Sequence, residues 1–409
     1  MPLRVDSERL RADFETLASF GATTDGGIER TTFSDAHSAA RRWFLERAAA
    51  AGLETRIDGA ANHSAILPAG DPHAKTLLLG SHLDSVKRAG RYDGALGVIC
   101  ALEVVRTVKD AGLELPVSLE AIDLTDEEGT LVGTLGSWAI AGLLIRETLA
   151  EPRGGRALLL DELERMGLSE ERLLAARRDP ATHLAFVELH IEQGDVLERA
   201  GTEIGVVTGI VGSSSFRVSF DGAARHAGTT PMDARRDAAV GAASFVLSVR
   251  ETVTRHFPGC VATVGDIAVE PGSFNVVPGR AVLQLECRSA DPVELDRLEE
   301  ALADRARSDA ERWDLDLAME RVGRWEPAPT DPWIREAIAA TATELGLSTL
   351  ELPSRAGHDA QALAAIGPSG MIFVPSVGGI SHDPAEKTEW RDCVNGANVL
   401  LGTVLRLAG

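Results

Sequence analysis

Apolar runs and helical patterns alternate along the first half of the chain. Residues 35–51 have the spacing of a helix and follow Ser34, a suitable N-cap, and residues 95–111 predict a second helix. Short apolar runs predict buried strands at residues 76–79, 117–123 and 184–189. Because strands alternate with helices, this order predicts an α/β domain whose mostly parallel mixed sheet is covered by helices.

The pattern changes after Gly209 and Gly212. It then predicts a strand, a helix, two strands, a helix and a strand. The four inner elements of this series lie near residues 235–256, 261–269, 281–287 and 293–310. The simplest interpretation is a compact α+β insert.

Proline-rich sequence from Trp325 to Pro332 has the composition of a linker, after which helix and strand patterns resume. We therefore expect a catalytic domain built from residues 1–210 and 326–409. Residues 211–325 are expected to form an inserted β-α-β-β-α-β domain between the two parts.

Composition and charge exclude several classes of protein. With 409 residues, 44% of them hydrophobic and 25% charged, the chain is long enough for two globular domains. The formal net charge of -21 argues against binding to nucleic acid or an anionic membrane surface. No apolar stretch has the length of a spanning helix and no secretory signal is evident, so a cytoplasmic protein is expected. Four widely spaced cysteines are typical of reduced core thiols.

Candidate chemistry lies where apolar strands run into polar turns, the place where open α/β sheets bind ligands. The four strand-end positions are His82, the pair Glu127 and Glu128, His190, and His382. Asp93 stands before a glycine turn and a predicted helix start. Taken singly, these residues could be core histidines, a helix N-cap or a solvated run of acids.

Taken together, they form a set of nitrogen and oxygen donors without cysteine. Such a set fits zinc, manganese, cobalt or nickel in a two-metal hydrolytic site, with Asp93 as the expected bridge. Asp84 can fix the ring of His82 from behind. Adjacent glutamates allow one carboxylate to bind metal while the other handles protons.

The same residues lie in motifs that resemble the metal-dependent amidohydrolase group, which includes carboxypeptidase G, aminoacylase, allantoate amidohydrolase, β-ureidopropionase and N-carbamoyl-L-amino-acid hydrolase. The resemblance runs from about residue 35 to the C-terminus and is closer to the carbamoylase and allantoate branch. It rests on the segments 80–84, 93–97, 126–129, 188–194, 226–232, 357–360 and 379–382.

This resemblance implies a role for each ligand. Asp93 would bridge two metal ions, His82 and His190 would complete one site, and Glu128 and His382 the other. Glu127 would be the catalytic base.

The resemblance also implies substrate contacts. His226, Asn275 and Arg288, all in the insert, would contact substrate, with His226 stabilising the oxyanion and Arg288 binding a carboxylate together with Asn275. In relatives the insert dimerises and lends such residues to the neighbouring active site, so a homodimer is implied. Gln193 and Gly357 are further candidates for contact with the substrate, whereas His358 is expected only to support the loop around Gly357.

The implied reaction is hydrolysis of an N-carbamoyl-L-amino acid to the amino acid, ammonia and carbon dioxide. Allantoate and β-ureidopropionate are alternative substrates, and N-acyl amino acids or peptides are further ones; a non-catalytic binding protein would be expected to lose a ligand or the base. Allantoate hydrolases usually carry an arginine after the Gly-x-x-Gly segment, where this chain has Ser213–Ser215. Carbamoylases often place a bulky residue there, so the sequence leaves the substrate open.

Overall fold

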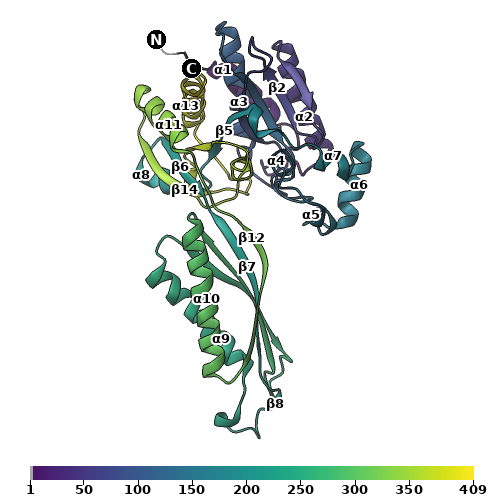
Figure 1. Ribbon diagram of the computed structural model, residues 1–409, viewed down its shortest axis with the longest axis vertical. Helices are drawn as coiled ribbons and strands as arrows, with labels where there is room; N and C mark the ends of the chain where they lie inside the picture. Colours follow the sequence, from purple (N-terminus) through teal and green to yellow (C-terminus); the bar gives the residue numbers. More distant parts are fainter. Residues whose placement is uncertain (1–2) are drawn as a thin grey trace. The chain divides into compact units, whose positions relative to one another are not determined.

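The computed structural model describes residues 3–409, which fall into two units (Figure 1). The main unit extends to Thr208 and resumes at Thr330. The insert unit is Gly209–Pro329, so it begins two residues before and ends four residues after the range expected from the sequence.

A central sheet organises the main unit. Its strands are β1 (Glu54–Ile57), β2 (His63–Leu67), β3 (Thr76–His82), β4 (Ser118–Leu124), β5 (His183–Ile191), β6 (Ile204–Ile210), β14 (Thr349–Ser354) and β15 (Ser369–Val374). Their order is β1-β2-β4-β3-β5-β15-β6, and β14 also pairs with β6. The inner strands β4, β3, β5 and β15 are parallel, whereas β1, β2 and β6 join as antiparallel neighbours. The predicted α/β class is confirmed.

Helices accompany this sheet. They are α1 (Ser7–Leu17), α2 (Asp35–Ala50), α3 (Ala95–Asp110), α4 (Leu135–Ala141), α5 (Arg146–Ala150), α6 (Arg156–Met166), α7 (Glu170–Leu174), α8 (Val196–Ala200), α11 (Pro332–Glu344), α12 (Asp359–Leu363) and α13 (Trp390–Ala408). The N-cap predicted for α2 is present, because the Ser34 side chain accepts a hydrogen bond from the amide of His37. Helix α3 is buried along nearly its whole length, as its apolar sequence requires.

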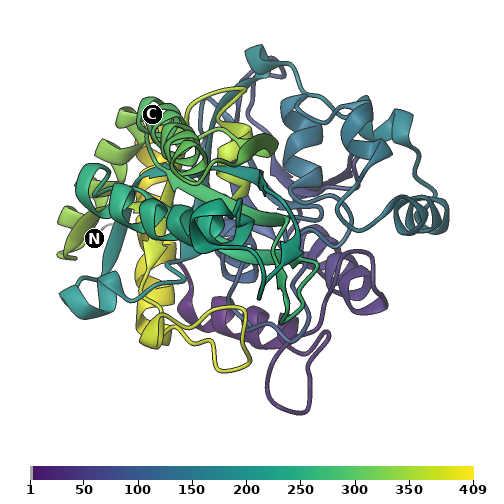
Figure 2. The same ribbon diagram turned by 90° about the horizontal axis from the view of Figure 1, so that it is seen from below.

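The segment from α4 to α7 has a small core of its own. Apolar side chains of these helices pack with Phe33, Ala60 and Ala61, and α5, α6 and α7 lie at the edge of the main unit (Figures 1 and 2). Helices of five to eleven residues give weak periodic signals. The sequence pattern therefore did not identify them.

The insert unit has the element order β-α-β-β-α-β. Its long elements are β7 (Gly212–Asp221), α9 (Ala238–His256), β9 (Val261–Glu270), β11 (Arg280–Ser289), α10 (Pro292–Arg312) and β12 (Asp316–Trp325). Two short strands, β8 (Arg225–His226) and β10 (Val276–Val277), pair with each other, whereas β13 (Ala328–Pro329) pairs with β6 as the last strand of the larger sheet. The strand order is β12-β7-β11-β9, and both helices pack against the apolar face of this sheet. The opposite face carries the polar residues of the alternating pattern.

Candidate metal centre

The carboxyl ends of the inner strands bring the predicted ligands together. His82 ends β3 and His190 lies near the end of β5, whereas Asp93 precedes the first turn of α3. The Nδ1 of His82 contacts the backbone carbonyl of Asp84 at 3.0 Å, and the Nδ1 of His190 contacts the carbonyl of Ile191 at 2.9 Å. Each contact gives Nδ1 a backbone acceptor, so Nε2 is the nitrogen that faces Asp93; the Nε2 of His190 also accepts the amide of Gly94 at 3.2 Å.

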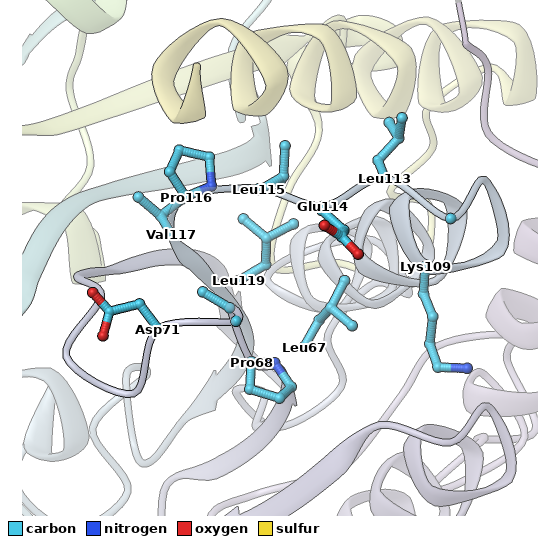
Figure 3. Close-up of a pocket in the computed structure, with 13 residues that line it drawn as sticks. Leu67, Pro68, Asp71, Lys109, Leu113, Glu114, Leu115, Pro116, Val117 and Leu119 are labelled. Atoms are coloured by element: carbon cyan, nitrogen blue, oxygen red, sulfur yellow. The ribbon is translucent and has the colours of Figure 1, made fainter.

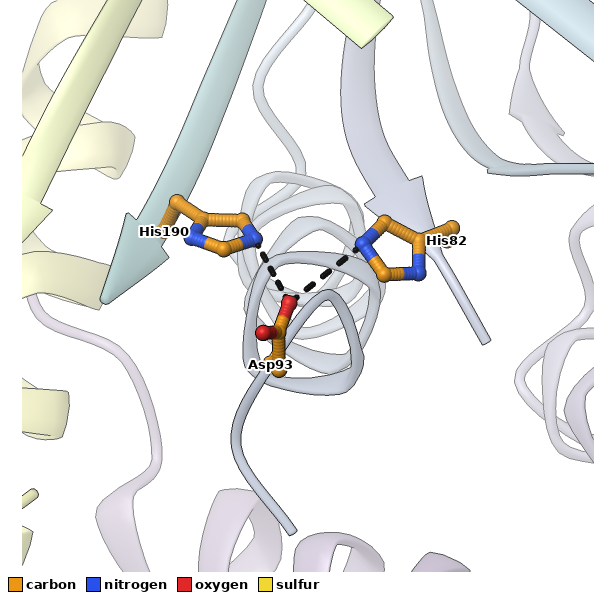
Figure 4. A group of neighbouring side chains, drawn as sticks. All are labelled: His82, Asp93 and His190. Atoms are coloured by element: carbon orange, nitrogen blue, oxygen red, sulfur yellow. Dashed lines mark ion pairs between the residues drawn. The ribbon is translucent and has the colours of Figure 1, made fainter. Parts of the chain in front are cut away.

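Asp93 presents its two carboxylate oxygens to two different groups. Oδ1 lies 3.5 Å from the Nε2 of His82 and 3.2 Å from the Nε2 of His190 (Figure 4). Oδ2 lies 3.3 Å from the Nε2 of His382, which is itself 3.6 Å from the Oε2 of Glu128. One carboxylate therefore faces two sets of donors, as a bridging ligand must.

A glycine makes this approach possible. Gly94 has φ +63°, and a Cβ atom there would lie 2.4 Å from the ring of His82. Both the left-handed backbone and the space therefore require glycine directly after Asp93.

Three groups of side chains could each hold an ion among residues 3–409. Within each group the donor atoms lie within 4.8 Å of one another. The groups are His82 with Asp93 and His190, Asp93 with Glu128 and His382, and Glu188 with His190 and His358. The first two share Asp93, and their imidazole and carboxylate donors fit a pair of divalent ions.

In the third group, the side chains of Glu188 and His358 already have hydrogen-bond partners within the protein. The two oxygens of Glu188 accept hydrogen bonds from the Ser81 hydroxyl at 2.7 Å and from the Ala360 amide at 3.0 Å. The Nε2 of His358 contacts the hydroxyl of Ser354 at 2.8 Å, and burial holds the pKa of His358 well below its usual value. His358 therefore supports the loop that contains Gly357.

Glu127 lies at the edge of the first group. Its Oε2 is 3.6 Å from the Nε2 of His82. Burial raises the pKa of Glu127 well above its usual value, although the charge of His82 opposes the shift. A buried carboxylate with a raised pKa, beside a ligand set, has the properties of a general base.

Burial and neighbouring charges also shift the pKa values of the other acids and histidines in the ligand cluster. Burial and the charge of Asp93 raise the pKa of Glu128 to about 7, and the hydrogen bond to Asp93 raises that of His382 to about 9. Burial raises the pKa of Asp93, but its three histidine neighbours outweigh this effect and hold it well below the usual range. A divalent cation would replace those protons, and its binding should therefore depend on pH.

Gln193 contacts the Asp93 carboxylate rather than open space. Its Nε2 lies 2.7 Å from the Oδ2 of Asp93, and its backbone has φ +59°. The substrate contact expected of Gln193 from sequence remains a prediction. The amide would have to leave Asp93, or use its oxygen, to reach a ureido group.

Two residues that the sequence did not single out also hold Asp93. The Glu386 carboxylate accepts hydrogen bonds from the amides of Tyr92 at 2.8 Å and Asp93 at 3.1 Å. The Ser381 hydroxyl lies 2.9 Å from Glu386 and 3.0 Å from Asp93. Ser381 lies within the 379–382 segment that carries the resemblance, and Glu386 lies four positions after His382, but neither of them was assigned a role from the sequence.

The predicted substrate residues of the insert unit are not all brought together. His226 on β8 pairs with Val276 on β10, and the carbonyl of Asn275 accepts the amide of Ala227, so His226 and Asn275 lie at one end of the unit. Arg288 lies near the other end of β11, where it forms an ion pair with Glu286 at 2.7 Å.

The length of β11 separates these residues. Arg280 is next to the β8–β10 end, and Arg288 lies eight positions after it, which corresponds to about 26 Å in an extended strand. Arg288 and Asn275 of one chain therefore lie too far apart to hold one carboxylate, and their joint contact with a substrate stays a prediction.

A cavity of about 750 Å³ lies at the opposite edge of the main sheet (Figure 3). Its lining includes Val117, which directly precedes β4, Leu119 on β4, and Leu67 at the end of β2. None of the predicted site residues lines it. A search for a functional site by cavity volume alone would therefore not find the ligand cluster.

Comparison with known families agrees with the ligand cluster. The family model described as "Peptidase family M20/M25/M40" matches residues 78–406, which include every predicted ligand. The chain belongs to this family. Among residues 3–409, no helix is both long and apolar enough to cross a membrane.

Relatives of this M20 chain match it from end to end. An N-carbamoyl-L-amino acid amidohydrolase of Geobacillus stearothermophilus is 39% identical, and the match covers 99% of this chain and 99% of the relative. An allantoate amidohydrolase of Bacillus subtilis is 32% identical, and the match covers 96% of each chain. A solved structure of an amidase of the hydantoinase/carbamoylase family from Burkholderia multivorans has a TM-score of 0.88 at 35% identity, covering 99% of this chain and 98% of that one. The M20 family is metal-dependent, and the shared Asp93 clusters are where this chain could hold metal.

Proposed function

We propose that this M20 chain hydrolyses the carbamoyl C–N bond of N-carbamoyl-L-amino acids, releasing the amino acid, ammonia and carbon dioxide. The observation that carries the proposal is the bridging position of Asp93 between two sets of donors, next to the buried carboxylate of Glu127. Similarity to the carbamoyl-amino-acid amidohydrolase of Geobacillus stearothermophilus supports the substrate class.

Two divalent ions, zinc or else manganese, cobalt or nickel, would occupy the centre. His82, His190 and Asp93 would hold one, and Asp93, Glu128 and His382 the other. The all-nitrogen-and-oxygen donor set and the Nε2 atoms turned toward Asp93 support this assignment. When bound, such ions lower the pKa of water and polarise a carbonyl group.

Residues of the chain would carry out the other steps of the reaction. Glu127 would accept a proton from the attacking water and return it to the leaving nitrogen. His226 would donate a hydrogen bond to the oxyanion, and Arg288 would bind the substrate carboxylate. Asp84 would hold the ring of His82 from behind, through the carbonyl contact at 3.0 Å.

Arg288 lies in a row of residues that fits one carboxylate and an apolar group. On the open face of the insert sheet, Ser213 stands opposite Arg288 on one side and opposite Trp325 on the other, and Val261 flanks Arg288 on β9. Directly opposite residues point to the same face, so Arg288 lies between the Ser213 hydroxyl and the apolar side chain of Val261, and Trp325 lies beyond Ser213. A hollow of about 360 Å³, lined partly by Ser215, lies beside this row.

This arrangement favours an N-carbamoyl amino acid with a single carboxylate and an apolar side chain. Allantoate is the second candidate, supported by the Bacillus subtilis relative. Ser213–Ser215 replace both the arginine of allantoate hydrolases and the bulky residue of carbamoylases, so these serines alone favour neither candidate.

We further propose that the active protein is a cytoplasmic homodimer in which each site uses the insert units of both chains. His226 and Asn275 lie about 26 Å or more from Arg288 within one chain, which is too far for one small substrate. Met232 and Phe274 next to them are strongly exposed apolar side chains, which a second chain could cover.

Release of ammonia from the ureido compounds and of acetate from the N-acetyl compounds tests the reaction. The panel contains N-carbamoyl-L-amino acids with apolar and acidic side chains, β-ureidopropionate, allantoate and N-acetyl amino acids, each with the metal-loaded protein. Carbamoyl-L-amino acids with apolar side chains should react fastest. Turnover of acetyl compounds without any ureido substrate would overturn the proposal.

Glu127→Gln provides the control for the centre. The variant should keep both ions and lose nearly all turnover, because an amide cannot accept the proton. Substantial turnover in a fully metal-loaded variant would remove Glu127 from the role of base.

A further inference from the structure

Thr32 lies between two buried carboxylates behind the ligand cluster. Its hydroxyl oxygen is 2.7 Å from the Oδ1 of Asp126 and 3.0 Å from the Oδ2 of Asp84. All three side chains are buried. Thr32 precedes the part of the chain matched by the family model and belongs to no helix or strand.

Asp84 holds the backbone that carries the base and one ligand. Its Oδ1 accepts the amide of Glu127 at 3.3 Å, and its Oδ2 accepts the amide of Glu128 at 3.2 Å. Any movement of the Asp84 carboxylate would therefore displace both glutamates.

Asp126 fixes the other side of the same turn. Its carboxylate accepts hydrogen bonds from three successive backbone amides, those of Leu131, Val132 and Gly133. Asp126 itself has φ +60°, a left-handed conformation that is strained for a residue with a side chain. These bonds help to hold the backbone next to Glu127 in that conformation.

The segment that carries Thr32 is itself anchored. Arg30 exchanges backbone contacts with Ser85, through the Ser85 amide at 3.0 Å and the Ser85 hydroxyl at 2.9 Å, and its Nε donates to the carbonyl of Leu83 at 2.5 Å. Thr32 therefore meets the two carboxylates from a fixed position, two residues beyond Arg30.

We propose that Thr32 is a positioning residue for the metal centre, acting through Asp84 and Asp126 on Glu127 and Glu128. Its single hydroxyl proton is donated to one carboxylate at a time, and the hydroxyl dipole lies between two like charges. Without it, two buried carboxylates would face a methyl group, and the turn that they hold would shift. This inference rests on the proposed function of Glu127 and Glu128.

Three variants test it. Thr32→Val removes the hydroxyl but keeps the shape, and Thr32→Ser keeps the hydroxyl. Thr107→Val is the matched control, because the Thr107 hydroxyl also donates to a buried carboxylate, that of Glu103 at 3.1 Å, but well outside the centre. Zinc binding to the metal-free proteins is measured by calorimetry, and kcat and KM are measured on the best substrate of the panel.

Thr32→Val should weaken binding of the more weakly held zinc ion and lower kcat, each by about 10- to 100-fold, the usual effect of losing a contact behind a ligand. KM should change less than about threefold, because Arg288 is untouched. Thr32→Ser should restore both quantities, and Thr107→Val should match the wild type in both.

Wild-type zinc affinity and kcat in Thr32→Val would overturn the proposal, as would equal losses in Thr32→Ser or in Thr107→Val. If Thr32→Val does not fold, Thr32→Ala takes its place with the same criteria. Zinc affinity is measured without substrate, so a protein that turns over no carbamoyl compound could still support the role of Thr32. The two proposals can therefore fail separately.

Discussion

Mixing two inactive variants should restore part of the activity. His226→Ala removes the proposed oxyanion donor, and Arg288→Ala removes the proposed carboxylate anchor, so each homodimer lacks one function in both of its sites. Because about 26 Å of strand β11 lies between the ends of the insert unit that carry these residues, the two side chains of one chain must serve different sites. A mixed dimer would then contain one site that lacks both residues and one site that is complete.

The size of the recovery follows from this arrangement. Random exchange of equal amounts of the two chains makes about half of the dimers mixed, and each mixed dimer has one complete site of two. The mixture should therefore reach about one quarter of the wild-type rate. A mixed dimer purified through two different affinity tags should reach about one half.

Ammonia release measures the recovery, and a second mixture provides the control. His226 and Asn275 lie at the same end of the insert unit, so His226→Ala mixed with Asn275→Ala leaves every site lacking one of the two and should recover nothing. A purified His226→Ala/Arg288→Ala dimer with no more activity than its parents would refute the reasoning. It would mean that both side chains serve one site, or that one of them serves none.

Three further predictions concern single positions. Gly94→Ala should lower the free energy of unfolding by at least about 1–2 kcal/mol, the cost of a left-handed alanine, as measured by denaturant titration. It should also weaken zinc binding, measured by calorimetry, because its Cβ would lie 2.4 Å from the ring of His82. An unchanged zinc affinity would count against this packing. Burial lowers the pKa of His183 to about 4, so the unfolded chain takes up a proton near its ordinary pKa of 6.5 and the folded chain does not. Stability should then fall by about 2 kcal/mol between pH 7 and pH 5, and His183→Leu should lose this part of the dependence in urea unfolding; parallel curves for the two proteins would contradict it. Ser213→Arg should place a second cation opposite Arg288 and raise kcat/KM for N-carbamoyl-L-aspartate relative to a carbamoyl amino acid with an apolar side chain, whereas an unchanged ratio would place the substrate elsewhere.

The positions of the predicted ligands followed from the sequence because one physical rule covers them. Parallel strands end at the same edge of a sheet, so His82 and His190, each after an apolar run, had to approach each other. Asp93 joins them because Gly94 lets the start of α3 come close to the ring of His82. The motif after β15 supplied His382 in the same way.

The contacts behind these ligands could not be predicted in the same way. Hydrophobic periodicity reports which face of an element is buried, but it does not identify the partner of a single hydroxyl or carboxyl group. Thr32 and Glu386 lie in segments without regular structure, and their contacts with Asp84 and Asp93 span 52 and 293 residues. Such contacts become visible only when the folded chain is known.

The pairing of Arg288 with Asn275 came from the family resemblance and not from the residues between them. The two residues are 13 positions apart in the sequence. The apolar run at 281–287 already predicted an extended strand between them, and a strand separates its ends more than any other element of equal length. The strand between the two residues therefore predicts that they lie far apart within one chain, although they are close in the sequence.

This separation has a consequence for the proposed enzyme. If His226 and Arg288 of one chain serve different sites, every complete site needs two chains, and a single chain has its ligand cluster but lacks part of its substrate contacts. Dilution below the dimer dissociation constant would then lower turnover without removing the metal ions, whereas Thr32→Val would weaken the metal centre without dissociating the dimer. The ligand cluster and the insert unit would thus fail under different perturbations, because the contacts that hold the cluster come from the main unit alone.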